Sequence, residues 1–281
     1  MGKNYLKILI QIPENRQDEM ILRLSDFGFN GFEQDGDTVA AWVQADHFSE
    51  SVQTEFDNWL EGVDDCHFLD LEVLADRNWN QEWEQTIRPQ TIGQFYIHPT
   101  WTNQPQAENT IPVTIDPKMS FGTGYHETTR LLLNMLPLFT RAGDRILDMG
   151  SGTGILAIAA LKLGANYAVC VDVDTWCFEN AGENAKLNGV EDVMDIRIGS
   201  TDQLHQDEMF DIVLANINRN ILLDLAVELT RAITPGGYLL LSGITEGDED
   251  DILNHPGYSG LLCEAVNAEN EWRAIGFRKP E

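Results

Sequence analysis

The chain has 281 residues, 43% of them hydrophobic, and its 46 acidic against 18 basic side chains give a formal net charge of −28. Binding to a nucleic-acid backbone needs a basic surface, so this balance argues against direct nucleic-acid recognition. No apolar run of about 18 residues is present, which argues against a membrane-spanning helix, and no signal-peptide pattern opens the chain. We therefore expect a cytoplasmic protein, whose acidic character fits either a basic protein partner or a generally acidic cytoplasm.

The cysteines and histidines show no metal-binding pattern. The six histidines form no H-E-x-x-H pair, and no C-x-x-C pair occurs among the four cysteines, Cys66, Cys170, Cys177 and Cys263. We interpret the cysteines as reduced thiols of a cytosolic protein and expect no metal site.

The first 75 residues follow the order strand, helix, strand, strand, helix, strand. Hydrophobic periodicity predicts the strands Tyr5–Ile12, Gly31–Gln34, Thr38–Gln44 and Phe68–Leu74 and the helices Asn15–Phe27 and Ser49–Leu60. Asn15 is a plausible N-cap of the first helix. This order is the split βαβ pattern of ferredoxin-like domains, and it carries no catalytic constellation. Residues 1–75 are therefore interpreted as a substrate-recognition domain, and residues 76–90 as a connecting helix and linker containing Trp79 and Trp83.

Residues 91–281 read as a second, larger domain in which strands and helices alternate, as in a parallel sheet. A proline-rich stretch with two short strands precedes the helix Thr128–Phe139, which Thr128 or Thr129 could cap. The predicted strands are Phe95–His98, Ile111–Ile115, Ile146–Met149, Tyr167–Val171, Met194–Ile198, Phe210–Ala215 and Tyr238–Gly243. The helices between the later strands are Gly154–Gly164, Thr175–Asn188 and Arg219–Ile233, and a hairpin of Leu261–Asn267 and Glu271–Arg278 closes the chain.

Three glycines, Gly150, Gly152 and Gly154, join the strand ending at Met149 to the next helix. Strand, glycine turn and helix is an arrangement that aims backbone N–H groups at an anionic ligand. The spacing G-x-G-x-G differs from the dinucleotide fingerprint G-x-G-x-x-G, and no P-loop motif is present. The glycine spacing therefore argues against a dinucleotide site and against a P-loop.

An acidic residue at the end of the next strand supports that interpretation. The carboxylate of Asp172 could accept hydrogen bonds from both hydroxyls of an adenosine ribose. Asp174 is the rival for this role, but its position is more typical of the start of the following helix.

These features together resemble the seven-stranded methyltransferases that depend on S-adenosylmethionine. Four segments are in addition similar to the ribosomal protein L11 methyltransferases (PrmA type), and the similarity extends over the whole chain: Phe121–Thr129, Ile155–Ala165, Leu214–Asn216 and Glu271–Trp272. The resemblance implies a seven-stranded Rossmann-like methyltransferase domain at 91–281, preceded by the small α+β ferredoxin-like domain. It also implies S-adenosylmethionine as cofactor and a ribosomal protein substrate, which the N-terminal domain grips and the methyltransferase domain methylates on amines.

The resemblance implies cofactor contacts at Thr129, Gly150, Asp172 and Asn216, and Gly152 is a further backbone contact. Asn216 also ends the fourth strand of the predicted sheet, at the edge where open α/β sheets bind ligands. Methyltransferases that act on base amines and on glutamine resemble one another in having an Asn-Pro-Pro-aromatic motif at this turn. The turn in this chain, Asn216-Ile-Asn-Arg, lacks that motif. This absence favours an aliphatic protein amine, on a lysine or at the N-terminus, and no general base is evident.

Three other functions are compatible with parts of the sequence. The same chemistry could act on another protein or on a small amine. A non-catalytic module could keep the fold and bind the cofactor without turnover. A nicotinamide-dependent dehydrogenase is disfavoured by the glycine spacing.

Overall fold

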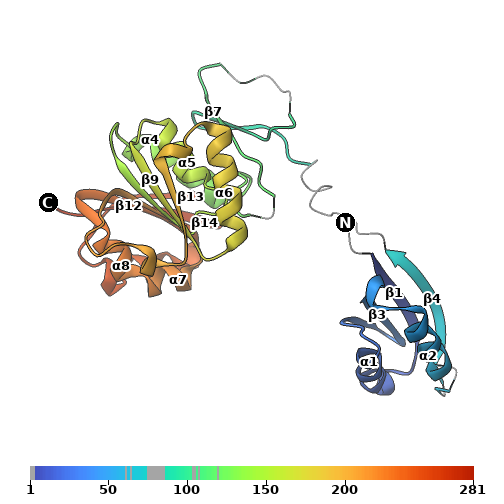
Figure 1. Ribbon diagram of the computed structural model, residues 1–281. Coiled ribbons are helices and arrows are strands. Elements are labelled where there is room, and N and C mark those ends of the chain that lie inside the picture. The colour runs from blue at the N-terminus through green and yellow to red at the C-terminus, as the bar shows by residue number, and fades with distance from the viewer. Residues whose placement is uncertain are drawn as a thin grey trace. The chain divides into compact units, whose positions relative to one another are not determined.

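The computed structural model describes residues 4–60, 62, 63, 65–74, 86–102, 106, 108–118 and 120–281. The chain divides into two compact units, Met1–Gln81 and Glu82–Glu281, which we describe one at a time (Figure 1). The predicted connecting helix, with Trp79 and Trp83, lies almost wholly outside the described residues. Its described end, Thr86–Arg88, is not helical.

The N-terminal unit is a four-stranded antiparallel sheet with two helices on one face. Its elements are β1 (Tyr5–Gln11), α1 (Gln17–Asp26), β2 (Gly31–Asp35), β3 (Thr38–Gln44), α2 (Glu50–Leu60) and β4 (His67–Leu74), in the strand order β2-β3-β1-β4. Alternate strand residues such as Ile8, Ile10 and Ala41 face a core that Leu24 of α1 and Phe56 of α2 complete. The strands therefore follow the period-two pattern expected of a sheet with one buried face.

One predicted detail of this unit is wrong. Asn15 does not cap the first helix, because residues Glu14–Arg16 form a separate 3₁₀ turn before α1. Arg16 occupies the N-cap position of α1 and makes no side-chain capping bond. The helix thus begins two residues later than the hydrophobic pattern suggested.

The C-terminal unit is built on a sheet that is parallel in its first five strands. Its elements are α4 (Glu127–Phe139), β8 (Arg145–Met149), α5 (Ile155–Lys162), β9 (Tyr167–Asp172), α6 (Thr175–Asn188), β10 (Met194–Ile198), β11 (Phe210–Asn216), α7 (Arg219–Asp224), α8 (Ala226–Arg231), β12 (Ile233–Thr245), α9 (Glu249–Leu253), β13 (Leu262–Glu269) and β14 (Trp272–Arg278). The strand order is β10-β9-β8-β11-β12-β14-β13, and β14 runs antiparallel to both of its neighbours. Short 3₁₀ turns occur in this unit at Glu191–Val193, Thr201–Gln203, Glu246–Asp248 and Pro256–Tyr258, and in the N-terminal unit at Ala45–His47.

Helices cover both faces of this sheet (Figure 1). Consecutive residues of β8 alternate between two cores: Ile146 packs with α4, α5 and α6, and Leu147 packs with α7, α8 and α9. A second, three-stranded sheet of β5 (Gln90–Ile92), β6 (Phe95–His98) and β7 (Ile111–Thr114) joins the first core. Strands buried on both faces explain why their sequences are almost uniformly apolar.

The order of the five parallel strands contains one reversal. The chain proceeds from β8 outward to β9 and β10 and then returns to β11, on the other side of β8. The carboxyl ends of β8 and β11 therefore flank the topological switch point, where open α/β sheets bind ligands.

The predicted helix Arg219–Ile233 is wrong in two respects. It is interrupted at Leu225, which separates α7 from α8. Its last residue, Ile233, instead begins β12, because Ile233 pairs with Phe210 of β11. The segment Pro235-Gly-Gly is part of this long strand, and an added Cβ at Gly237 would lie 2.7 Å from the carbonyl oxygen of Asp211.

Among the described residues, no helix has the length and apolarity needed to cross a bilayer.

Candidate active site

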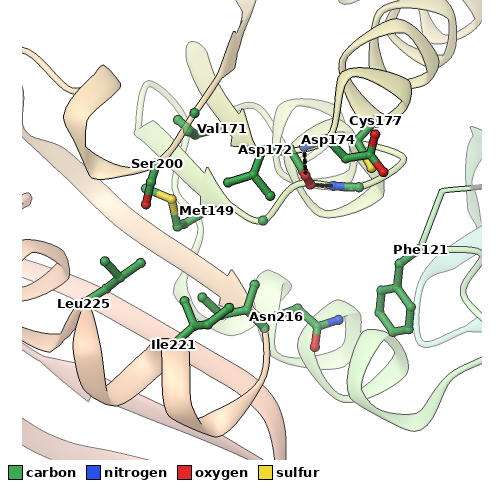
Figure 2. Close-up of a pocket in the computed structure, with 15 residues that line it drawn as sticks. Phe121, Met149, Val171, Asp172, Asp174, Cys177, Ser200, Asn216, Ile221 and Leu225 are labelled. Atoms are coloured by element: carbon green, nitrogen blue, oxygen red, sulfur yellow. Dashed lines mark hydrogen bonds between the residues drawn. The ribbon is translucent and has the colours of Figure 1, made fainter.

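A cavity of about 400 Å³ lies at the carboxyl edge of the large sheet, at the switch point (Figure 2). The ends of four adjacent strands, β10, β9, β8 and β11, contribute to its wall, together with a loop before α4 and the α7–α8 segment. Its lining residues are Phe121, Met149, Gly150, Gly152, Val171, Asp172, Val173, Asp174, Cys177, Gly199, Ser200, Asn216, Ile217, Ile221 and Leu225. Four of the five sequence-predicted site residues line it, and Thr129 does not.

The glycine loop has a left-handed backbone. Gly150, Gly152 and Gly154 have φ values of +74°, +54° and +79°. An added Cβ would also collide with the side chain of Ile217 at the first position and with the carbonyl oxygen of Phe121 at the second. The glycines are thus required by close packing within the protein as well as by their backbone angles.

The expectation that this loop aims free N–H groups at an anion is wrong. The N–H groups of Gly150 and Ser151 donate to the carbonyl oxygen of Val171, at 2.8 and 3.2 Å. The remaining N–H groups of the loop donate to Asp172 Oδ2 from Gly152 (2.8 Å), to Phe121 O from Thr153 (2.9 Å) and to Ser151 O from Gly154 (2.8 Å). All five donors are therefore used within the protein, and an anionic group would find no unpaired N–H there.

Asp172 ends β9 and presents its carboxylate to the cavity. Oδ2 accepts from the N–H of Gly152 at 2.8 Å, and Oδ1 accepts from the N–H of Asp174 at 3.0 Å (Figure 2). Each carboxylate oxygen retains capacity for a further hydrogen bond. Asp174 instead caps α6, and its carboxylate accepts from the N–H of Trp176 at 2.9 Å. The sequence predicted this position at the start of the helix.

Asn216 faces the same cavity from the end of β11. Its Nδ2 donates to the hydroxyl of Thr129 at 3.3 Å, and its buried Oδ1 has no hydrogen-bond partner among the described residues. Thr129 is fully buried in α4, behind Asn216. The predicted capping by Thr128 or Thr129 is wrong, because His126 occupies the N-cap and its Nδ1 accepts from the N–H of Thr128.

Asp148 is a buried acid that the sequence analysis did not assign to the site. It lies in β8 beneath the glycine loop, where Oδ2 accepts from the N–H of Ala157 at 3.2 Å and Oδ1 has no partner in the described part of the chain. Burial, with a smaller contribution from the negative charge of Asp172, raises the pKa of Asp148 to about 7. The sequence feature that could have identified Asp148 is a carboxyl group within an otherwise apolar predicted strand.

The loop before α4, which carries Phe121 on one side of the cavity, is hydrogen-bonded to several elements. The hydroxyl of Thr153 donates to the carbonyl oxygen of Gly122 at 2.7 Å, which ties this loop to the glycine turn. Arg130 donates to Glu269 at 2.9 Å and also to the carbonyl oxygen of Tyr125. The β13–β14 hairpin therefore supports the loop that carries Phe121.

The fold and the site together define a class. A large, mostly parallel sheet with helices on both faces and a cavity at its switch point is the mixed α/β fold of the Rossmann-like methyltransferases. Two hydrogen-bond acceptors belong to residues that line the cavity: the carboxylate of Asp172 and the buried carboxamide oxygen of Asn216, which has no partner among the residues described. Such acceptors suit the amino and hydroxyl groups of S-adenosylmethionine. The residues present thus fit this cofactor.

Comparisons with known proteins identify the family. The family described as "Ribosomal protein L11 methyltransferase (PrmA)" matches residues 5–280. Relatives named ribosomal protein L11 methyltransferase include those of Porphyromonas gingivalis, 37% identical over 273 residues (94% of this chain, 91% of the relative), and Bacteroides fragilis, 36% identical over 268 residues (94% of each). The crystal structure of the ribosomal protein L11 methylase from Lactobacillus delbrueckii subsp. bulgaricus matches with a TM-score of 0.64 at 27% identity, covering 69% of this chain and all of that one.

The chain therefore belongs to the ribosomal protein L11 methyltransferase (PrmA) family. This confirms the resemblance stated from the sequence. S-adenosylmethionine is the methyl donor, as the sequence predicted.

Proposed function

We propose that this protein transfers methyl groups from S-adenosylmethionine to amine nitrogens of ribosomal protein L11, on lysine side chains, on the N-terminal α-amine, or on both. Membership of the family supports the substrate. The observation that carries the chemistry is the carboxamide of Asn216: this residue lines the cavity, and its buried Oδ1 has no hydrogen-bond partner among the described residues. A ribosomal protein as substrate would place the reaction in the cytoplasm.

The site residues would divide the cofactor between them. The carboxylate of Asp172 would accept from the ribose hydroxyls, while Gly150 and Gly152 would let the backbone approach the methionine portion. Asn216 would offer its free acceptor, and Thr129 would act indirectly by holding the Asn216 carboxamide through the 3.3 Å hydrogen bond. Thr129 is therefore proposed as a positioning residue.

The bound sulfonium would supply an electrophilic methyl group, so the acceptor amine must present a free lone pair. Deprotonating a lysine of pKa about 10.4 at pH 7 costs roughly 4–5 kcal/mol, and an α-amine near pKa 8 costs about 1 kcal/mol. The cavity wall beside Asn216 is apolar, formed by Ile217, Ile221 and Leu225, and desolvation there lowers the pKa of an amine. Asn216 Oδ1 could accept a hydrogen bond from the neutral amine and orient its lone pair.

We further propose the domain roles 1–75 for substrate recognition, 76–90 for the connection and 91–281 for catalysis. The spatial strand order β4-β1-β3-β2 of the N-terminal unit, with both helices on one face, supports a ferredoxin-like fold. The seven strands of the large sheet, counted over the described residues, support the seven-stranded methyltransferase architecture.

The test is incubation of the enzyme with labelled cofactor and L11 purified without its methyl groups, followed by mass spectrometry of the product. Label on amines of L11 is the expected result. Label only on another protein or a small amine would replace the substrate, and cofactor binding without transfer to any acceptor would support a non-catalytic module.

A further inference from the structure

The helical segment that follows β11 is interrupted at a single residue, Leu225, beside the cavity. Helix α7 ends at Asp224 and α8 begins at Ala226, while Leu225 between them has φ −94° and ψ 6°. Ile221 of α7 and Leu225 itself both line the cavity (Figure 2). The interruption therefore sets the position of part of the cavity wall.

The residues of this segment do not explain the interruption. The sequence of residues 219–231, RNILLDLAVELTR, contains no proline and no glycine, and most of its residues favour a helix. A side chain that enters the ladder of backbone hydrogen bonds is a further recognised cause of a break in a helix. The structure supplies such a side chain from a distant part of the chain.

This side chain is Tyr258, in the 3₁₀ turn Pro256–Tyr258. Its hydroxyl donates to the carbonyl oxygen of Leu222 at 2.5 Å. In an uninterrupted helix this carbonyl would accept from the N–H of Ala226, and the described residues contain no such bond. Leu222 is fully buried and Tyr258 is 1% exposed, so bulk water does not compete for the carbonyl. The hydroxyl thus takes the place of one helical N–H.

The turn that carries Tyr258 packs closely against α8. An added Cβ at Gly257 would lie 2.6 Å from the Cβ of Ala226, and the hydroxyl of Thr230 donates to the carbonyl oxygen of Gly257 at 2.9 Å. On its other side, the ring of Tyr258 stacks on that of Phe277 in β14, with the centroids 5.6 Å apart. Contacts with α8 and with the sheet therefore fix where the hydroxyl lies.

We propose that Tyr258 is a positioning residue for cofactor binding: its hydroxyl keeps the helix interrupted at Leu225 and so places Ile221 and Leu225 in the cavity wall. Tyr258 does not line the cavity itself and acts through the α7–α8 segment. Without the hydroxyl, the buried carbonyl of Leu222 would be left unpaired unless it took the N–H of Ala226. That exchange would close the interruption and displace the two side chains. The proposal rests on the proposed function only in taking this cavity as the cofactor site, and it holds for any acceptor amine.

Tyr258→Phe in the full chain tests the proposal, because it removes only the hydroxyl. We expect the Kd for S-adenosylmethionine to rise about tenfold, measured by calorimetric titration at a temperature where the variant is fully folded. Ile233→Val is the matched control: Ile233 is fully buried in the same core but pairs with the first residue of β11, away from the cavity. Loss of one buried methylene destabilises a protein about as much as loss of one hydrogen bond. This control should keep its Kd within about twofold of wild type.

A second variant reaches the same contact without altering the tyrosine. The new Cβ in Gly257→Ala would collide with Ala226 and push the turn away from α8, so the Kd should again rise several-fold. Adding Ala226→Gly removes the atom with which it collides. The double variant should therefore bind the cofactor nearly as well as the wild type.

The outcomes separate this proposal from the proposed function. A Kd for Tyr258→Phe within twofold of wild type, or an equal loss in Ile233→Val, would overturn the role of Tyr258 alone, provided that Asp172→Ala weakens binding. If Asp172→Ala binds the cofactor like the wild type, the cavity is not the cofactor site and both proposals for it fall. Should Tyr258→Phe fail to fold, Gly257→Ala decides: an unchanged Kd, or no recovery in the double variant, would refute the role of Tyr258.

Discussion

Asp172 is the residue whose replacement tests the assignment of the cofactor site most directly. Its two carboxylate oxygens already accept from the N–H groups of Gly152 and Asp174, at 2.8 and 3.0 Å, and their remaining capacity faces the cavity. Hydrogen bonds to a charged group contribute about 1.5–3 kcal/mol each. Loss of two such bonds to a ribose, partly compensated by water, should cost about 3 kcal/mol, or roughly a hundredfold in affinity.

The assay is calorimetric titration of Asp172→Ala with S-adenosylmethionine, after circular dichroism has shown that the variant is folded. Asp174→Ala is the matched control, because Asp174 lines the same cavity but its carboxylate caps α6. We expect this control to lose about 1 kcal/mol of folding stability, as for the loss of an N-cap, and to keep its cofactor affinity within about threefold. An Asp172→Ala affinity within twofold of wild type, or a larger loss in Asp174→Ala, would refute the assignment.

Three further predictions concern the surroundings of the cavity. Asp148 has a pKa of about 7 in the folded protein, against an ordinary value of 3.8, so the free energy of unfolding of the wild type should fall as the pH rises from about 4 to 7. Asp148→Asn should remove this pH dependence, measured by urea denaturation. Gly152→Ala should cost about 2–4 kcal/mol, from its left-handed φ and the collision with Phe121, measured by the same method. Thr129→Val should lower kcat about tenfold at unchanged fold, because the carboxamide of Asn216 loses its hydrogen bond.

Two of these predictions have a control within the chain. Gly189 also has a positive φ, +65°, but an added Cβ meets nothing within 4 Å, so Gly189→Ala should cost less than Gly152→Ala. Thr129→Ser keeps the hydroxyl and should retain most of the activity. Equal losses in the two glycine variants, equal kcat in Thr129→Val and wild type, or an unaltered pH slope in Asp148→Asn would contradict the respective argument.

Local patterns in the sequence predicted most of the secondary structure. The strand at Ile146–Met149 and the helix after Gly154 were predicted from an apolar run and a glycine turn, and the structure has both within a residue or two. The helix Thr175–Asn188 was predicted with its observed bounds, and Asp174 caps it. These features depend on hydrogen bonds and side-chain periodicity within a few residues, which is why the sequence alone determines them.

The same reasoning failed where a partner distant in the chain decides the conformation. Ile233 belongs to a strand because it pairs with Phe210, although its local pattern continued a helix. The cap of α4 was missed for a local reason: it is the side chain of His126, which is a less common capping residue than the nearby threonines.

The sequence by itself determined the alternation of strands and helices, the glycine turn and the acid at the end of the next strand. Only the tertiary structure decided how these parts are used. The N–H of Thr153 donates to the carbonyl oxygen of Phe121. The Nδ2 of Asn216 donates to Thr129, a residue 87 positions away, while its buried Oδ1 has no partner among the described residues. Whether a polar group is satisfied or available depends on what the fold places opposite it, and local periodicity carries no information about that.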